Sequence, residues 1–409
     1  MKAILSLILI LVLSLLFRLL FFPSHDTSRI AGQQIEVQGI IWDEPRRSQF
    51  SQRFVIDDLT ISVPEYPEYF FGDKLMVKGV IEESTFITKS GEEITQLIVR
   101  DPQIEQVPTP KLLQGVIWML HRVTTIVTQS IPSDEAALLL GITIGVRSEF
   151  DQEMVDMFRT TGILHVVAAS GSNVVTLTGV VLYSLNRIVR RRLAIGITVI
   201  VIAWYAVLAG FDPPIVRASI MALITLIAQF VGRQNYSLFA LGITAWLMLM
   251  IQPQLLGDVG FQLSITATGG IIVAKPFLDL LLRVPKIIKD DLSTTLAAQL
   301  GSIPVMLGAF GSFAPMSVII NLAVLWTVPI IMILGLLASF GALVHPILSI
   351  PFIYAAYPFL VYFMWVISCT YPFVTPLNVT EFGPFLTISY YFISLSIILL
   401  LKQKTYGKN

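Results

Sequence analysis

The most constraining feature of this sequence is a near-continuous series of apolar runs from Gly162 to about residue 401. A helix that crosses a bilayer needs roughly 20 apolar residues, and several of these runs reach that length. Lipid offers the backbone no hydrogen-bond partners, so such runs must form helices that satisfy their own N–H and C=O groups. Only 13% of the residues are charged and the mean hydropathy is +0.78, which excludes an ordinary soluble domain. The sequence predicts a polytopic α-helical membrane protein.

We expect about ten membrane spans. The first lies within residues 1–30, where the apolar run at 3–22 is interpreted as an anchor. A cleaved signal peptide is the alternative, but the run is long, Arg18 interrupts its end, and no A-x-A-like cleavage site follows. A polytopic domain over 162–402 holds the other nine, and a tail covers 403–409. These nine are expected near residues 162–185, 193–211, 214–231, 236–252, 254–274, 292–310, 314–341, 350–373 and 384–401.

Residues 31–107 differ in character from the rest of the chain. They form short β-branched segments with partial alternation, separated by Pro, Gly and Ser clusters, which is the signature of strands and turns. Four or five strands in this length fit a small β-barrel or sandwich, and the OB type is a candidate. The segment holds 14 Asp and Glu residues against 7 Lys and Arg residues, a net charge of −7. We predict an extramembrane all-β domain inserted after the first span.

Residues 108–161 are predicted to be a linker with amphipathic or interfacial helices. Apolar residues recur with helical spacing from 112 to 131, and Lys111, His121 and Arg122 interrupt them, as in a helix that lies at the membrane surface. The apolar segment at 134–147 is too short to cross alone, so it is either interfacial or re-entrant.

Basic residues between the predicted spans define the orientation. The segment "NRIVRRR", Arg233, the segment "RVPKIIK" and the Lys-bearing tail all fall on one side when the spans are threaded alternately. The positive-inside rule makes that side cytoplasmic. We therefore expect a multi-pass protein of the cytoplasmic (plasma) membrane with an extracytoplasmic β-domain and a cytoplasmic C-terminus. The run at 314–341 holds Pro329, so it is expected to tilt, kink or split.

One span carries an unusual set of polar and small residues, namely His165, Ser170, Gly171, Ser172, Asn173 and Thr176. Three structures are compatible with this pattern. An unbroken helix would align most of them as one polar stripe. The Ser170-Gly171-Ser172 triplet could instead break the helix and expose backbone groups to a substrate, as in many transport proteins. Alternatively, the small residues allow a close helix–helix contact without any role in binding.

Other polar residues lie in later spans. Arg217 follows a Pro-Pro helix start, and Asp258 and Gln262 are four residues apart, on one helical face. The threaded topology places His165, Arg217 and Asp258 in the outer half of the bilayer, where Arg217 and Asp258 either neutralise each other or contact substrate. Gln299 and Asn321 are also candidates, although a lone amide in a span more often joins helices than binds a ligand. The single cysteine, Cys369, is expected in the core.

At these residues the chain resembles a known family. The stretch "HVVAASGSNV" is similar to the signature of ComEC-type competence proteins, and "PPIVRASIM", "PQLLGDVGFQLS", "QLGSIP" and "NLAVLWTVP" match later motifs in the same order. The resemblance covers about residues 30 to 400, including the amino-terminal OB-type domain. Asn173 stands where the family has a second histidine, which argues against a metal site, and no cofactor is expected. The family's metallo-β-lactamase-like domain has no counterpart here, so we expect no nuclease or other enzymatic activity.

The resemblance implies a membrane channel component for uptake of single-stranded DNA during natural transformation. It also implies an external DNA receptor, a cytoplasmic helicase-like motor, a separate nuclease, contacts with membrane lipids, and a homo-oligomer as a further possibility. Arg217 is expected to meet a phosphate because a guanidinium suits phosphate geometry, with Asp258 holding it oriented. The net charge of the β-domain predicts weak binding of single-stranded DNA or none, since such binding needs basic residues. We expect most aromatic residues of that domain to fill its core.

Two alternative functions stay open from the sequence. A transporter of another small anionic or lipid substrate on the same fold would use the same polar residues. A membrane enzyme would use His165 as base and Ser170 or Ser172 as nucleophile, but neighbours on one helix rarely align for proton transfer.

Overall fold

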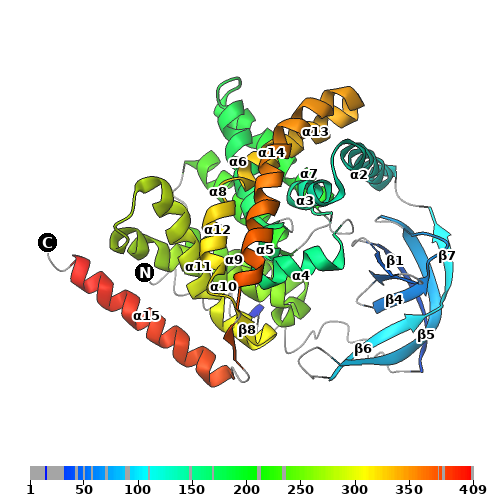
Figure 1. Ribbon diagram of the computed structural model, residues 1–409, viewed down its shortest axis with the longest axis horizontal. Helices are drawn as coiled ribbons and strands as arrows, with labels where there is room; N and C mark the ends of the chain where they lie inside the picture. Colours follow the sequence, from blue (N-terminus) through cyan, green and yellow to red (C-terminus); the bar gives the residue numbers. More distant parts are fainter. Residues whose placement is uncertain are drawn as a thin grey trace.

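The computed structural model describes the chain as a curved β-domain beside a large helical domain (Figure 1). The described residues are 14–15, 32–41, 45–48, 51–56, 59–69, 72–87, 93–108, 111–146, 150–167, 170–209, 213–232, 236–375, 377–379 and 383–406. The predicted anchor over 1–30 therefore lies outside the described residues except for Ser14 and Leu15. Leu15 packs beside Met248 and Phe261, and Trp246 donates to the Ser14 hydroxyl at 3.1 Å.

The β-domain is one curved sheet in the order β1-β5-β6-β4-β3-β2, with β7 paired to β5. The long strand β5 organises it: residues 74–80 pair with β1, residues 74–78 also pair with β7, and residues 81–87 pair with β6. One face buries an apolar core that includes Phe54, Tyr69 and Leu75. The strands are β1 (Gln34–Ile40), β2 (Arg46–Ser48), β3 (Ser51–Ile56), β4 (Leu59–Pro64), β5 (Lys74–Ile87), β6 (Glu93–Arg100) and β7 (Gln103–Val107).

The prediction of four or five strands is wrong, because the described residues contain seven in this segment. Two expected strands are each divided in two. The strands β3 and β4 form an antiparallel hairpin on either side of residues 57–58, and Asp101, with a φ of 45°, separates β6 from β7. Both interruptions occur at aspartates, which tolerate turn conformations. The expectation for the aromatic residues is confirmed for Phe54 and Tyr69, whose rings pack 5.5 Å apart in the core, and is wrong for Tyr66, which is 69% exposed. Trp42, Phe50, Phe70 and Phe71 lie outside the described residues.

The helical domain begins with α2 (Lys111–Ser130), which is amphipathic as predicted. It buries Val116, Val123 and Val127 on one face and exposes Trp118 and His121 on the other. The next helix, α3 (Ser133–Ile144), has every residue from Ala136 to Ile144 buried. A helix that is apolar on all sides belongs in a protein core, so α3 packs inside the helical domain, and its interfacial or re-entrant position stays a prediction. Helix α3 packs against α13 and α14, far along the chain.

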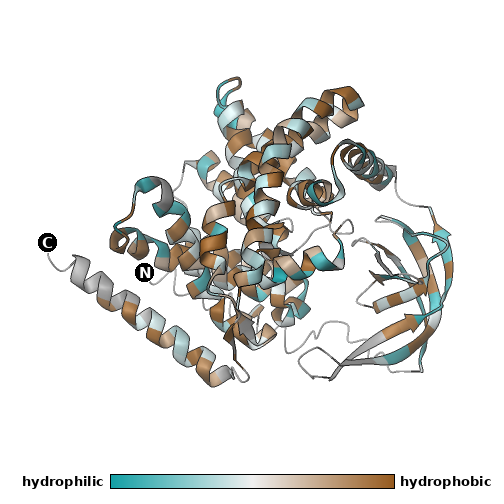
Figure 2. Ribbon diagram, viewed as in Figure 1, coloured by the Kyte–Doolittle hydropathy of each residue, from teal (hydrophilic) through white to brown (hydrophobic). Residues whose placement is uncertain are grey.

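The remaining helices form the body of the domain, and apolar residues cover their outer faces as well as their contacts (Figure 2). They are α4 (Gln152–Thr160), α5 (Leu164–Val167), α6 (Gly171–Leu185), α7 (Arg191–Leu208), α8 (Pro213–Val231), α9 (Ser237–Ile251), η1 (Pro253–Gly257), α10 (Val259–Leu281), α11 (Lys286–Phe310), α12 (Ser317–Val324), α13 (Val328–Val344), α14 (Pro346–Thr370), η2 (Tyr371–Phe373) and α15 (Pro384–Tyr406). The short strands β8 (Ser312–Phe313) and β9 (Leu377–Asn378) pair with each other.

Five helices in the described part of the chain are long and apolar enough to cross a membrane, and six if a bent pair counts as one span. The bent pair is α12 with α13, at an angle of 48°, so the run predicted at 314–341 does split, immediately before Pro329. The expected total of ten spans stays a prediction. Cys369 is exposed on α14, so its predicted place in the core is wrong; it lies on a face of the helix that no described element covers.

Candidate functional site

The polar segment at 164–173 is a broken helix. Helix α5 ends at Val167, and α6 starts at Gly171 after Ser170, whose φ of −113° and ψ of 164° are extended. The unbroken polar stripe is therefore wrong, and the helix break is the alternative that the structure adopts. The Ser170 side chain makes no capping hydrogen bond to α6, so the N-cap residue itself leaves the first N–H groups of this helix without a side-chain acceptor.

Asn173 holds α6 against α3. Its side chain is 1% exposed, and Nδ2 donates to the carbonyl oxygen of Ile142 at 2.7 Å. Its Oδ1 accepts from the Ser170 hydroxyl at 3.3 Å, and that hydroxyl also lies 2.6 Å from the Ser172 hydroxyl. Asn173 thus satisfies a carbonyl near the C-terminal end of α3, and its amide fixes the position of the break.

Arg217 lies at the start of α6 although it belongs to α8. A Cβ atom built on Gly171 would be 2.8 Å from Arg217 Nη2, so the guanidinium lies directly against this glycine. Arg217 is 7% exposed, and Nη1 donates to the hydroxyl of Thr268 on α10. Its Nε is buried and makes no hydrogen bond to a described residue. A buried cation without a full set of partners thus meets the positive end of a helix.

The predicted pairing of Arg217 with Asp258 is wrong. Asp258 instead caps α10, where its Oδ1 accepts from the backbone N–H of Phe261 at 2.6 Å. Gln262 donates from Nε2 to the Leu256 carbonyl at 2.7 Å. The two residues do lie one turn apart, as predicted, but both are used to shape the start of α10. An aspartate at an N-cap stabilises the start of its own helix, so its presence in the sequence does not require an ion pair.

Gln299 and Asn321 flank the first turn of α12. Gln299 Nε2 donates to the Ser317 hydroxyl at 2.9 Å, which joins α11 to α12. Gly162, with a φ of +75°, lies against the same serine, since a Cβ atom there would be 2.8 Å from Ser317 Cβ. Asn321 is 3% exposed, and its Oδ1 is buried without a hydrogen bond to any described residue. The structure therefore uses Gln299 as a helix-joining amide. The His165 backbone belongs to α5, but its side chain lies outside the described residues.

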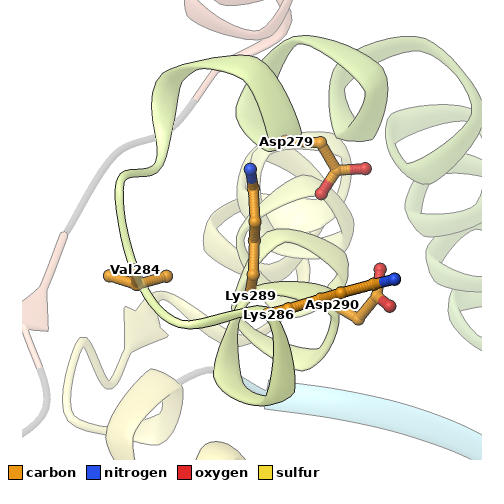
Figure 3. A pocket seen from close by; sticks show the side chains of 5 residues that line it. All are labelled: Asp279, Val284, Lys286, Lys289 and Asp290. Atoms are coloured by element: carbon orange, nitrogen blue, oxygen red, sulfur yellow. The ribbon is translucent and has the colours of Figure 1, made fainter.

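A second polar cluster, which the sequence reading missed, joins the ends of α10 and α11. Lys275 Nζ lies 3.3 Å from Asp279 Oδ2, 3.0 Å from Asp290 Oδ1 and 3.3 Å from the Ser293 hydroxyl. Beside it is a hollow of about 380 Å³, lined by Asp279 and Asp290 with Lys286 and Lys289 (Figure 3). The i,i+4 spacing of Lys275 and Asp279 was the available signal. All three ammonium protons of Lys275 have acceptors, so the role of the cluster is to hold α10 against α11, and we call it the clamp at Lys275.

The described residues include no group of three or more His, Cys, Asp or Glu side chains positioned to hold a metal ion. The chemistry that the site supports is the binding of an anion by Arg217 and the N-terminus of α6.

Comparison with known proteins identifies the family. A family model described as "Competence protein" matches residues 142–404, which include the broken helix, Arg217 and the whole of α8 to α14. The chain belongs to the competence protein family. A curated competence relative, ComE operon protein 3 of Bacillus subtilis (strain 168), is 26% identical over 238 residues. This alignment covers 56% of the chain and 30% of the relative. No solved structure matches the chain.

Proposed function

We propose that this protein is the membrane component through which one DNA strand crosses the cytoplasmic membrane during natural transformation. Membership of the competence protein family supports a role in competence and DNA uptake. The polytopic helical domain supports passage through the membrane, because the chain has at least five helices of spanning length.

The observation that carries the proposal is the environment of Arg217. A buried guanidinium and an uncapped helix N-terminus meet at Gly171, and both favour a phosphate. Burying a cation in a membrane domain is costly, and the described partner of Arg217 is the Thr268 hydroxyl rather than a carboxylate, which supports a functional role. Each phosphate of a passing strand would be paired for a moment and then released, because a single arginine provides too few contacts to retain it.

Several parts of the proposal extend beyond the helical domain. We propose that the β-domain is OB-like and extracytoplasmic, that the whole chain has about ten spans, and that the C-terminus is cytoplasmic. Since the β-domain segment carries a net charge of −7, DNA delivery is assigned to an external receptor rather than to this domain. Energy would come from a cytoplasmic helicase-like motor, and degradation of the second strand from a separate nuclease. His165 is proposed to line the outer mouth.

A second candidate function uses the same site. A transporter of a small anionic solute or lipid would also place a buried arginine at a helix N-terminus. The two functions are separated by a transformation assay in a strain that lacks the gene. Loss of transformation with normal binding of DNA to the cell surface supports the proposed function, whereas normal transformation with an altered lipid or metabolite profile supports the transporter.

A further inference from the structure

A surface hollow lies far along the chain from Arg217, between α2 and the junction of α13 with α14. It is a hollow of about 350 Å³, within the range of small-ligand sites. Its lining residues are Trp118, His121, Arg122, Thr125, Ile126 and Pro346.

Arg122 is the positive charge of this hollow, and its position is fixed by two contacts. Its Nε donates to the Ala342 carbonyl oxygen at 2.6 Å, one of the four C-terminal carbonyls of α13 that no helical N–H can reach. Its guanidinium carbon lies 5.2 Å from the centre of the Trp118 ring. The two Nη atoms make no hydrogen bond to a described residue, and the hollow borders this side chain. A preorganised fork of N–H donors is the geometry that binds a phosphate.

The hollow lies where two apolar helices end. Helix α13 ends at Val344, and the spanning helix that follows begins at Pro346, so two apolar helices end beside Arg122. Around this junction the exposed side chains are large and apolar: Phe340 is 57% exposed, Val344 75% and Ile347 66%. Arginine and tryptophan side chains are typical of the membrane–water boundary. A phosphate site with an apolar border fits a ligand that carries both a phosphate and hydrocarbon chains.

We propose that this hollow binds the phosphate of an anionic phospholipid, whose acyl chains lie along the exposed apolar surface of α13 and α14. Arg122 would pair with the phosphate through its Nη atoms, and His121 and Thr125 would contact the glycerol or headgroup oxygens. A free phosphate would gain nothing from the apolar border, whereas a phospholipid uses both parts of the surface. Basic hollows between membrane helices bind anionic headgroups in this way. The proposal does not depend on which substrate the protein transports.

Native mass spectrometry of the full chain tests this. The protein is reconstituted in equal amounts of phosphatidylglycerol and phosphatidylcholine, extracted in mild detergent, and scored for retained lipid. We expect wild-type protein to retain phosphatidylglycerol, and Arg122→Gln to lower its occupancy about tenfold, as the loss of a charge-assisted contact predicts. Because Arg122→Gln also removes the bond to Ala342, Thr125→Trp serves as a second variant that fills the hollow and leaves Arg122 in place.

Arg187→Gln is the matched control. The Arg187 guanidinium also stacks on an aromatic ring, 4.3 Å from the centre of Tyr183, but it lies on an exposed turn and is not among the residues that line the hollow at Arg122. We expect this variant to retain lipid as wild type does. Equal retention of the two lipids by wild-type protein, or unchanged retention in both Arg122→Gln and Thr125→Trp, would overturn the proposal. Displacement of the lipid by millimolar glycerol phosphate would overturn the assignment to a phospholipid.

Discussion

Gly270 of α10 and Gly301 of α11 face each other so closely that a Cβ atom on Gly270 would lie 3.0 Å from the Cα atom of Gly301. The two backbones are therefore in direct contact, as small residues allow in membrane helices. Helix α15 reinforces this contact, because the Tyr391 hydroxyl donates to the Gly301 carbonyl at 2.8 Å.

The first prediction concerns this contact. Gly301→Val should lower the stability of the helical domain by about 1–3 kcal/mol, since a branched side chain cannot fit between two touching backbones. The measurement is thermal unfolding in detergent. Gly196→Ala is the matched control, because a Cβ atom at Gly196 in α7 meets nothing within 4 Å. If Gly301→Val and the control unfold at the same temperature, the close contact of α10 and α11 is not present in the protein.

Asn173 provides the second prediction. Asn173→Leu should cost about 1–3 kcal/mol, because it leaves the buried carbonyl of Ile142 without a donor. Ser172→Ala should cost much less, since Ser172 is exposed. Chemical unfolding followed by tryptophan fluorescence would compare the two. Equal stability of both variants would show that Asn173 does not join α6 to α3.

The third prediction tests the anion site. Arg217→Gln should lower transformation about a hundredfold at normal expression, because a charge-assisted phosphate contact is lost. Arg217→Lys should recover only part of it, since an ammonium cannot bind a phosphate in a bidentate fashion. Arg192→Gln is the control, an exposed arginine stacked on Phe230 at 5.5 Å. Normal transformation by Arg217→Gln would remove this residue from the DNA path.

Two further variants test other candidate residues. Asp258→Asn should transform normally, because asparagine caps a helix about as well as aspartate does. This reverses the expectation of a partial loss that an ion pair with Arg217 would produce. His165→Ala should reduce uptake if the imidazole lines the conduit. Transformation frequencies, normalised to the amount of membrane-inserted protein, measure both.

The fourth prediction concerns the clamp at Lys275. Lys275→Met should destabilise the helical domain by about 1–2 kcal/mol, because Asp279 and Ser293 lose their shared donor. Asp290→Asn should have a smaller effect, since this side chain is 72% exposed and its ion pair is screened by water. Melting temperatures of the two variants test the order. The reverse order would mean that Lys275 is held by Asp290 alone.

How far the sequence predicts this structure depends on the range of the interactions involved. The helix break at Ser170 and the split before Pro329 follow from local preferences, and both were among the predicted alternatives. The contact of Asn173 with Ile142 is different, because the acceptor is a backbone carbonyl that carries no mark in the sequence. Arg217 illustrates the same limit: the sequence suggested Asp258 as an ion-pair partner in a neighbouring span, but packing placed the Thr268 hydroxyl beside it.

The buried position of α3 has a consequence for the synthesis of the protein. Gly335 of α13 packs directly against Thr143 and Leu139 of α3, yet the ribosome makes α3 long before it reaches α13. An apolar segment of 12 residues is too short to be inserted as a span by itself. Until α13 is synthesised, α3 must therefore lie outside its final position, shielded by lipid headgroups or by the insertion machinery. Assembly of the helical domain thus finishes from its C-terminal half, and a chain arrested before α13 would present α3 as a target for quality-control proteases.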